Sequence, residues 1–296
     1  CQIRDTLSNN VYFKGGELMT QPAKSSTDLS YVEADLNYVI DTGTPPVMYV
    51  DWPEEEHKAS PPLYEARRCK IYDARPISAQ FGLATHGFEM TRIPSQVTDF
   101  YDKDEVERVY NPEVVNIIKV AMGARDVVVF DHTFRTLNDA IIKSKGTREP
   151  VKAVHNDYTD RSARQRVTDI MGDDQAETLL EKRFAIVQTW RPVNHEVMTE
   201  PFALADGRTI PNSNFVPLQR RYSYRTAETY HISFDPNHMF YYLPEMTPEE
   251  TYIFKVYDTD RKAGVRFTAH TAFDDPTSAP NARPRESVES RALVFF

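Results

Sequence analysis

Cysteine is scarce in this chain, with only Cys1 and Cys69 among 296 residues. Two thiols so far apart do not form the disulfide framework of a small secreted protein, and a thiolate zinc site needs more of them. The sequence therefore predicts a fold that its core stabilises, in a cytoplasmic or otherwise reducing compartment.

Long apolar runs and basic excess are lacking as well. No stretch approaches the roughly 20 apolar residues that cross a bilayer, and residues 1–10 do not resemble a signal peptide, so we expect neither. The net charge of −9 disfavours nucleic acid as a partner, because phosphates demand a basic face. We expect a small organic substrate; a homodimer is compatible with the sequence, which does not indicate the oligomeric state.

The composition that remains, 40% hydrophobic and 11% aromatic, suits one packed domain over residues 1–296. Residues up to about 75 are rich in Pro, Asp and Glu and predict an irregular N-terminal layer with a short strand at 46–51. Apolar spacing predicts a helix over residues 104–124, which Pro112 breaks and Gly123 ends.

From residue 126 to the end the pattern is mainly β. Strands are predicted at residues 126–132 and 153–158, and surface helices at 160–183 break near Gly172. Six further strands are predicted at residues 184–191, 225–234, 239–243, 252–258, 265–273 and 286–296. About eight strands suit a double-stranded β-helix, or jelly roll. The predicted class is α+β, with a jelly-roll core over residues 126–296 and flanking helices.

A His-x-Asp pair lies in the second of these strands. Residues i and i+2 of a strand share a face, so His155 and Asp157 present an imidazole and a carboxylate together. Among the later histidines, His270 lies on a late strand and is favoured as the third ligand over His195, His231 and His238. The turn at residues 235–237 explains His231 and His238 adequately. Two imidazoles and one carboxylate leave positions on Fe(II) open.

The following strand carries a candidate anion anchor. Arg285 and Ser287 share one face, and a guanidinium with a hydroxyl suits the far carboxylate of 2-oxoglutarate. Arg291 lies at an even offset from Arg285 and is kept as the alternative or second anchor. No catalytic residue beyond the metal site is expected.

Three further residues are candidates for the substrate pocket. His132 and Arg135 follow a buried strand, where a strand-end hydrogen-bond network explains them equally well. Trp190 could wall the pocket, although a core aromatic is the simpler interpretation.

The chain also resembles a known family from about Val32 to its end. The resemblance is to the fungal hydroxylase/desaturase and cephalosporin 7α-methoxylase-like oxygenases, and it is most specific in the last 30 residues. It implies a jelly roll that uses Fe(II), 2-oxoglutarate and O2 in oxidative tailoring: hydroxylation, desaturation or endoperoxide formation on a secondary metabolite such as a terpenoid or polyketide hybrid (a meroterpenoid). The matching segments are residues 130–135, 155–159, 190–192, 241–242, 254–255, 270–276 and 285–291, with His238.

Two other functions stay open on the sequence alone. A zinc- or iron-dependent hydrolase or isomerase could use the same three ligands, but it would need neither Arg285 nor Ser287. A non-catalytic binding protein on the same scaffold would not need intact His155, Asp157 and His270.

Overall fold

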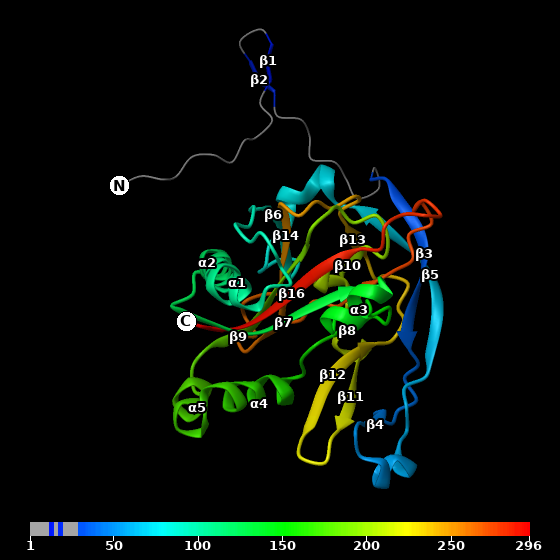
Figure 1. Ribbon diagram of the computed structural model, residues 1–296, viewed down its shortest axis with the longest axis vertical. Helices are drawn as coiled ribbons and strands as arrows, with labels where there is room; N and C mark the ends of the chain where they lie inside the picture. Colours follow the sequence, from blue (N-terminus) through cyan, green and yellow to red (C-terminus); the bar gives the residue numbers. More distant parts are fainter. Residues whose placement is uncertain (1–11, 15–16, 20–28) are drawn as a thin grey trace.

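The computed structural model describes residues 12–14, 17–19 and 29–296, and two sheets dominate it (Figure 1). The larger sheet has nine strands, and the smaller has five. Their strands come from distant parts of the sequence, so the chain passes repeatedly between the two sheets, as in a jelly roll. A separate two-stranded pair joins β1 (Tyr12–Lys14) and β2 (Glu17–Met19).

The nine-stranded sheet carries His155 and His270 on two short central strands, and Asp157 directly follows the first of them. In spatial order its strands are β3 (Tyr31–Val39), β5 (Tyr64–Asp73), β13 (Phe240–Tyr242), β10 (Phe202–Ala205), β15 (His270–Ala272), β8 (His155–Asn156), β12 (Thr226–Ile232), β11 (Phe215–Arg221) and β4 (Val47–Tyr49).

The five-stranded sheet is built from long strands, and β16 lies between β9 and β7 along most of its length. Its spatial order is β6 (Phe88–Arg92), β14 (Glu250–Asp258), β9 (Phe184–Pro192), β16 (Glu286–Phe295) and β7 (Asp126–Thr136).

Helices cover the outside of the five-stranded sheet and one end of the barrel. The predicted helix over residues 104–124 begins as α1 (Lys103–Glu105), continues through a π-helical turn, η4 (Val106–Tyr110), and ends as α2 (Asn111–Met122). Gly123 closes it at φ 61°, a conformation that glycine adopts without strain. The others are α3 (Asp139–Lys145), α4 (Asp160–Met171) and α5 (Asp173–Leu180), with short 3₁₀ turns η2 (Pro53–Lys58), η3 (Arg75–Gln80), η5 (Gly207–Thr209) and η6 (Asn212–Asn214).

Strand alternation divides the core into an inner and an outer layer. On β16, Leu293 and Phe295 point inward among the aromatic residues between the sheets. Val288, Ala292 and Val294 point outward against α2 and η4. The jelly-roll prediction is therefore confirmed, since one sheet face packs on the other sheet and the opposite face on helices.

The N-terminal prediction needs correction. Residues 31–73, expected to be largely irregular, contain the long antiparallel pair β3 and β5, which extends the nine-stranded sheet. Polar residues alternate along β3 and β5 because the outer face of these strands is exposed. The sequence of this region is therefore rich in Asp and Glu, which makes the two strands difficult to recognise. None of the helices in the described residues is long and apolar enough to cross a membrane.

Candidate active site

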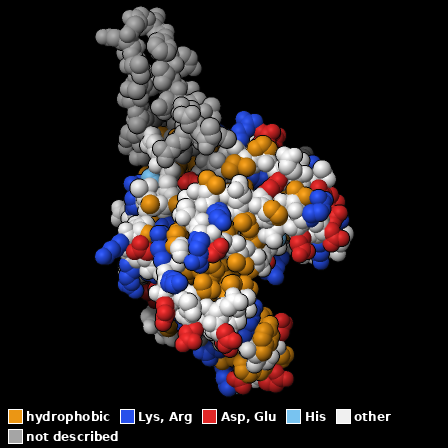
Figure 2. Space-filling view, turned by 90° about the vertical axis from the view of Figure 1, so that its left-hand side faces the viewer, with side chains coloured by type: hydrophobic (Ala, Val, Ile, Leu, Met, Phe, Trp, Pro, Cys, Tyr) orange, Lys and Arg blue, Asp and Glu red, His pale blue; other side chains and the backbone are white. Residues whose placement is uncertain are grey.

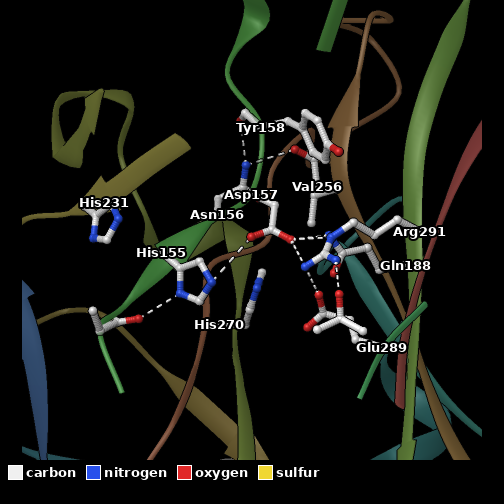
Figure 3. A network of polar contacts seen from close by, with 12 residues as sticks. His155, Asn156, Asp157, Tyr158, Gln188, His231, Val256, His270, Glu289 and Arg291 are labelled. Carbon is white, nitrogen blue, oxygen red and sulfur yellow. Dashed lines mark hydrogen bonds and ion pairs between the residues drawn. The ribbon is translucent and has the colours of Figure 1, made fainter. Parts of the chain in front are cut away.

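The first two predicted ligands lie where β8 ends. The strand comprises only His155 and Asn156, shorter than the six residues predicted. The Asn156 amide donates to the carbonyl oxygens of Tyr158 and Val256, at 2.7 and 2.9 Å, and this fixes the turn that follows. Asp157 is thereby held beside His155, with Oδ1 3.4 Å from the imidazole Nε2 (Figure 3).

The third predicted ligand comes from the neighbouring strand. β15 pairs with β8 so that His270 lies directly opposite His155, and their ring centroids are 4.4 Å apart. One ligand atom from each of His155, Asp157 and His270 lies within 4.8 Å of the other two. Residues more than a hundred positions apart in the sequence thus converge on one point.

Both imidazoles are oriented for metal binding. Nδ1 of His155 lies 2.7 Å from the carbonyl oxygen of Ala153, and Nδ1 of His270 lies 3.1 Å from that of Thr268. Each ring therefore keeps Nε2 for a ligand, the arrangement usual for metal-binding histidines. Nε2 of His270 is buried without a hydrogen-bond partner among the described residues. Burial, followed by the nearby His155, lowers the pKa of His270 to about 3, so its ring is neutral and able to bind a metal.

The Asp157 carboxylate is divided between two tasks. Its Oδ2 accepts hydrogen bonds from Nε2 of Gln188, at 2.7 Å, and from Nε of Arg291, at 2.8 Å. Its Oδ1 faces the imidazole of His155. Burial acts to raise the pKa of Asp157, but Arg291 and His155 overcome it and hold the pKa well below its usual range. The carboxylate is therefore ionised, with one oxygen free for a metal.

Arg291 is already surrounded by carboxylates. Besides Asp157, its guanidinium contacts Asp131 and Glu289. Burial acts to lower the pKa of Arg291, but these three carboxylates raise it well above its usual range. This geometry favours support of Asp157 over the alternative in which Arg291 anchors a co-substrate.

Arg285 is in the opposite situation. It is 1% exposed, yet it makes no ion pair within the part of the chain that the structure describes. Its Nη1 donates to the carbonyl oxygen of Glu200, and its Nε has no partner. Burial, with repulsion from Arg135, lowers the pKa of Arg285 to about 9. A buried guanidinium without a counter-ion is costly, and an anionic ligand would remove that cost.

A stack of aromatic rings connects Arg285 to the metal site. The guanidinium lies 5.3 Å above the ring of Trp190, and Trp190 stacks on Phe202 at 4.9 Å. Phe202 in turn stacks on the His270 ring at 5.3 Å. Ser287 is also buried here, with its Oγ 3.4 Å from the Arg135 carbonyl oxygen.

Two of the pocket candidates do not line the cavity beside the metal site. His132 faces the helical layer, where its Nδ1 lies 2.8 Å from Oγ of Ser290 and its ring 5.5 Å from that of Tyr110. Phe134, two residues further along β7, packs in the same outer layer, so His132 points away from the barrel interior. Trp190, 1% exposed, is a core aromatic that supports Arg285.

The third candidate, Arg135, does line that cavity, which has a volume of about 790 Å³ and reaches His155 and Asp157. Its guanidinium donates to the Glu149 carbonyl oxygen at 2.9 Å. Burial lowers its pKa.

Sequence reasoning missed two residues of the site, Gln188 and His231. His231 pairs with His155 across β12 and β8, stacks on its ring at 6.0 Å, and lies 3.0 Å through Nδ1 from the Tyr64 hydroxyl. His231 is a buried residue of β12. The expectation that the turn at residues 235–237 explains it is therefore wrong. Both residues are found only through the register between strands, and a single sequence does not show register.

The fold and the site together define a class of protein. A jelly roll with two histidines and one carboxylate converging at the end of its central strands is the arrangement of mononuclear non-haem iron oxygenases. The orphaned Nε2 of His270 and the ionised Asp157 fit a divalent metal ion.

Comparison with known proteins agrees with this class. The family model described as "Oxidoreductase/YMDC permease-like domain" matches residues 36–295. The Fe(II)/2-oxoglutarate-dependent dioxygenase nvfI of Aspergillus novofumigatus is 34% identical over 236 residues, covering 77% of this chain and 83% of the relative. The hydroxylase/desaturase efuI of Hormonema carpetanum is 29% identical over 79% of this chain and 85% of its own. The solved structure of the iron and alpha-ketoglutarate-dependent endoperoxidase NvfI superposes with a TM-score of 0.79 at 28% identity, covering 90% of this chain and 98% of that one.

The chain therefore belongs to the family of Fe(II)/2-oxoglutarate-dependent dioxygenases. It is an enzyme, and its cofactor and co-substrates are Fe(II), 2-oxoglutarate and O2.

Proposed function

We propose that His155, Asp157 and His270 hold Fe(II) in this chain and that Arg285, with Ser287, binds the far carboxylate of 2-oxoglutarate. The observation that supports the proposal best is the convergence of the three ligand atoms within 4.8 Å. The uncompensated guanidinium of Arg285, connected to His270 through Trp190 and Phe202, supports the co-substrate assignment.

The protein's own contribution to the reaction is binding, orientation and exclusion of water. When bound, the iron and its co-substrates supply the oxidising power that attacks an unactivated C–H bond. Gln188 and Arg291 hold one oxygen of Asp157 so that the other stays directed at the metal. Phe202 and Phe254 pack on the His270 ring and keep that side of the metal site apolar.

The proposed reaction is oxidative tailoring of a secondary metabolite. Its relatives include proteins named as a hydroxylase/desaturase and an endoperoxidase, so hydroxylation, desaturation and endoperoxide formation are the outcomes we consider. We propose a terpenoid or polyketide hybrid as the substrate class. A cytoplasmic location fits the scarcity of cysteine, because Cys69 is free where the structure describes it. The partner that we propose is the small-molecule substrate. A homodimer is compatible with the sequence.

Conversion of 2-oxoglutarate to succinate tests this function. The purified chain, given Fe(II), 2-oxoglutarate and O2, is expected to release succinate slowly without a substrate and faster with a suitable one. Omission of Fe(II) or O2 should abolish the release. Turnover of a substrate without succinate would contradict the proposal and revive the hydrolase or isomerase alternative.

A further inference from the structure

The cavity beside the metal site is formed by elements from three parts of the chain. α4 contributes one wall, the β11–β12 hairpin a second and β7 a third, and both α4 and the hairpin lie at the same end of the barrel (Figure 1). Thr159 caps α4 and donates from Oγ1 to Glu228 on β12 at 2.6 Å, which ties two of the walls together. The cavity has a volume of about 790 Å³, which suits one organic molecule of moderate size.

The charge of this cavity is opposite to that of the chain. Seven arginines and four carboxylates line it, an excess of three positive charges, whereas the whole chain carries −9. On the face that Figure 2 shows, acidic and basic side chains are interspersed, so positive charge is not concentrated there. Positive charge is therefore gathered at a cavity that reaches His155 and Asp157.

Two of these arginines are occupied. Arg291 binds Asp157, as described above, and Arg161 pairs with Glu228 at 2.7 Å. Glu228 also accepts hydrogen bonds from Thr159 and Gln219. Its carboxylate therefore has its partners within the cavity wall.

The other five arginines make no ion pair with any described carboxylate. Two of them, Arg135 and Arg166, are half-buried in the cavity wall, whereas Arg148, Arg220 and Arg225 are exposed and form what we call the rim. Arg225 lies over the rings of Tyr222 and Tyr224, at 4.8 and 5.8 Å.

Apolar groups line the same cavity as these arginines and His155. Phe130, Val151 and Tyr158 supply apolar surface there, and Tyr224 supplies some beside Arg225. A ligand that fits this cavity has an apolar body and a negative charge at one end. The charge would lie at the rim, and the body would reach the metal.

We propose that the substrate is an organic oxyanion, a carboxylate or a phosphate ester, whose charged group binds at Arg148, Arg220 and Arg225 while its apolar body extends to the metal site. This proposal rests on the proposed function and narrows it. Rim binding sets which carbon of the substrate lies beside the metal, so the three arginines determine specificity.

Binding of 1-pyrenebutyrate and of its uncharged methyl ester to the full chain tests the proposal. The acid is expected to bind at least about tenfold more tightly than the ester, with a preference that shrinks as salt is added. Inorganic phosphate and acetate, as competitors, distinguish the two oxyanions: stronger displacement by phosphate supports a phosphate ester, and stronger displacement by acetate a carboxylate.

Arg220→Gln and Arg225→Gln identify where the charge binds. Each is expected to weaken binding of the acid several-fold and to leave binding of the ester unchanged. Arg221→Gln is the matched control, because Arg221 follows Arg220 on β11, does not line the cavity and donates to Gln219 Oε1 at 2.8 Å.

Two results would overturn the proposal. One is equal affinity for acid and ester. The other is a preference for the acid that survives in both rim variants and disappears in Arg285→Gln, because the acid would then occupy the co-substrate position. Succinate release without any probe tests the iron and 2-oxoglutarate assignment separately, so failure of one proposal is distinguishable from failure of the other.

Discussion

Arg291 donates from Nε to Oδ2 of Asp157 across 2.8 Å, from a strand that begins 129 residues after this carboxylate. Oδ1 of the same carboxylate lies 3.4 Å from Nε2 of His155. One carboxylate thus joins a structural ion pair to the face proposed for the metal, and the ion pair determines which oxygen the metal receives.

Removal of this guanidinium is expected to weaken metal binding. In Arg291→Gln the Asp157 carboxylate loses its strongest partner, and second-sphere changes of this kind cost about 10–100-fold in metal affinity. Anaerobic titration with Fe(II) measures the effect. Arg283→Gln is a suitable control, because Arg283 pairs with Glu286 away from the site. Unchanged metal affinity together with a raised KM for 2-oxoglutarate would instead make Arg291 the anchor.

Arg285 should affect the co-substrate and not the metal. Arg285→Gln removes the uncompensated buried guanidinium, so the KM for 2-oxoglutarate is expected to rise at least about tenfold while affinity for Fe(II) is unchanged. Arg285→Lys keeps the charge but not the bidentate geometry. Its KM for 2-oxoglutarate should therefore lie between that of the parent protein and that of Arg285→Gln. A normal KM in Arg285→Gln would show that the far carboxylate binds elsewhere.

The inner core predicts a large stability difference between two leucines. Leu204 on β10 is 0% exposed, and Leu204→Ala is expected to lower the free energy of unfolding by about 2–5 kcal/mol. Leu63 is 59% exposed, so Leu63→Ala should change it by less than about 0.5 kcal/mol. Urea unfolding of the metal-free protein measures both. Similar losses in the two variants would contradict the packing described here.

His238 predicts a dependence of stability on pH. Burial lowers its pKa to about 4, whereas an unfolded histidine titrates near 6.5. Between these values the unfolded chain binds a proton that the folded chain does not, so the free energy of unfolding falls as pH decreases from 6.5 to 4. His238→Gln should fall less steeply over this range, and His57→Gln, at an exposed site, should follow the parent protein. Identical slopes for parent and His238→Gln would show that His238 does not carry this effect.

The sequence predicts those parts of the fold that depend on local periodicity. The helix ending at Gly123, the break at Gly172 and the long strands β9 and β16 follow from spacing and turn residues. β10 and β11 were not predicted, because their register with neighbouring strands lies outside any local pattern. Short strands such as β8 and β15 are stabilised by tertiary pairing, so their ends are not encoded locally.

The site divides along the same line. His155, Asp157 and His270 were predictable because the chemistry of the ligands limits the choice of residues. The roles of Gln188, His231 and Arg291 depend on which side chains meet across strands. That information arises only when the sheets form.

Anaerobic titration of three proteins with Fe(II) tests the central claim most directly. The parent chain and His231→Ala should each bind one Fe(II) per chain, because His231 lies outside the three-ligand cluster. His270→Ala should bind it at least about a hundredfold more weakly, because one of three protein ligands is lost. Equal affinity in His270→Ala and the parent chain would contradict the assignment of the metal to His155, Asp157 and His270.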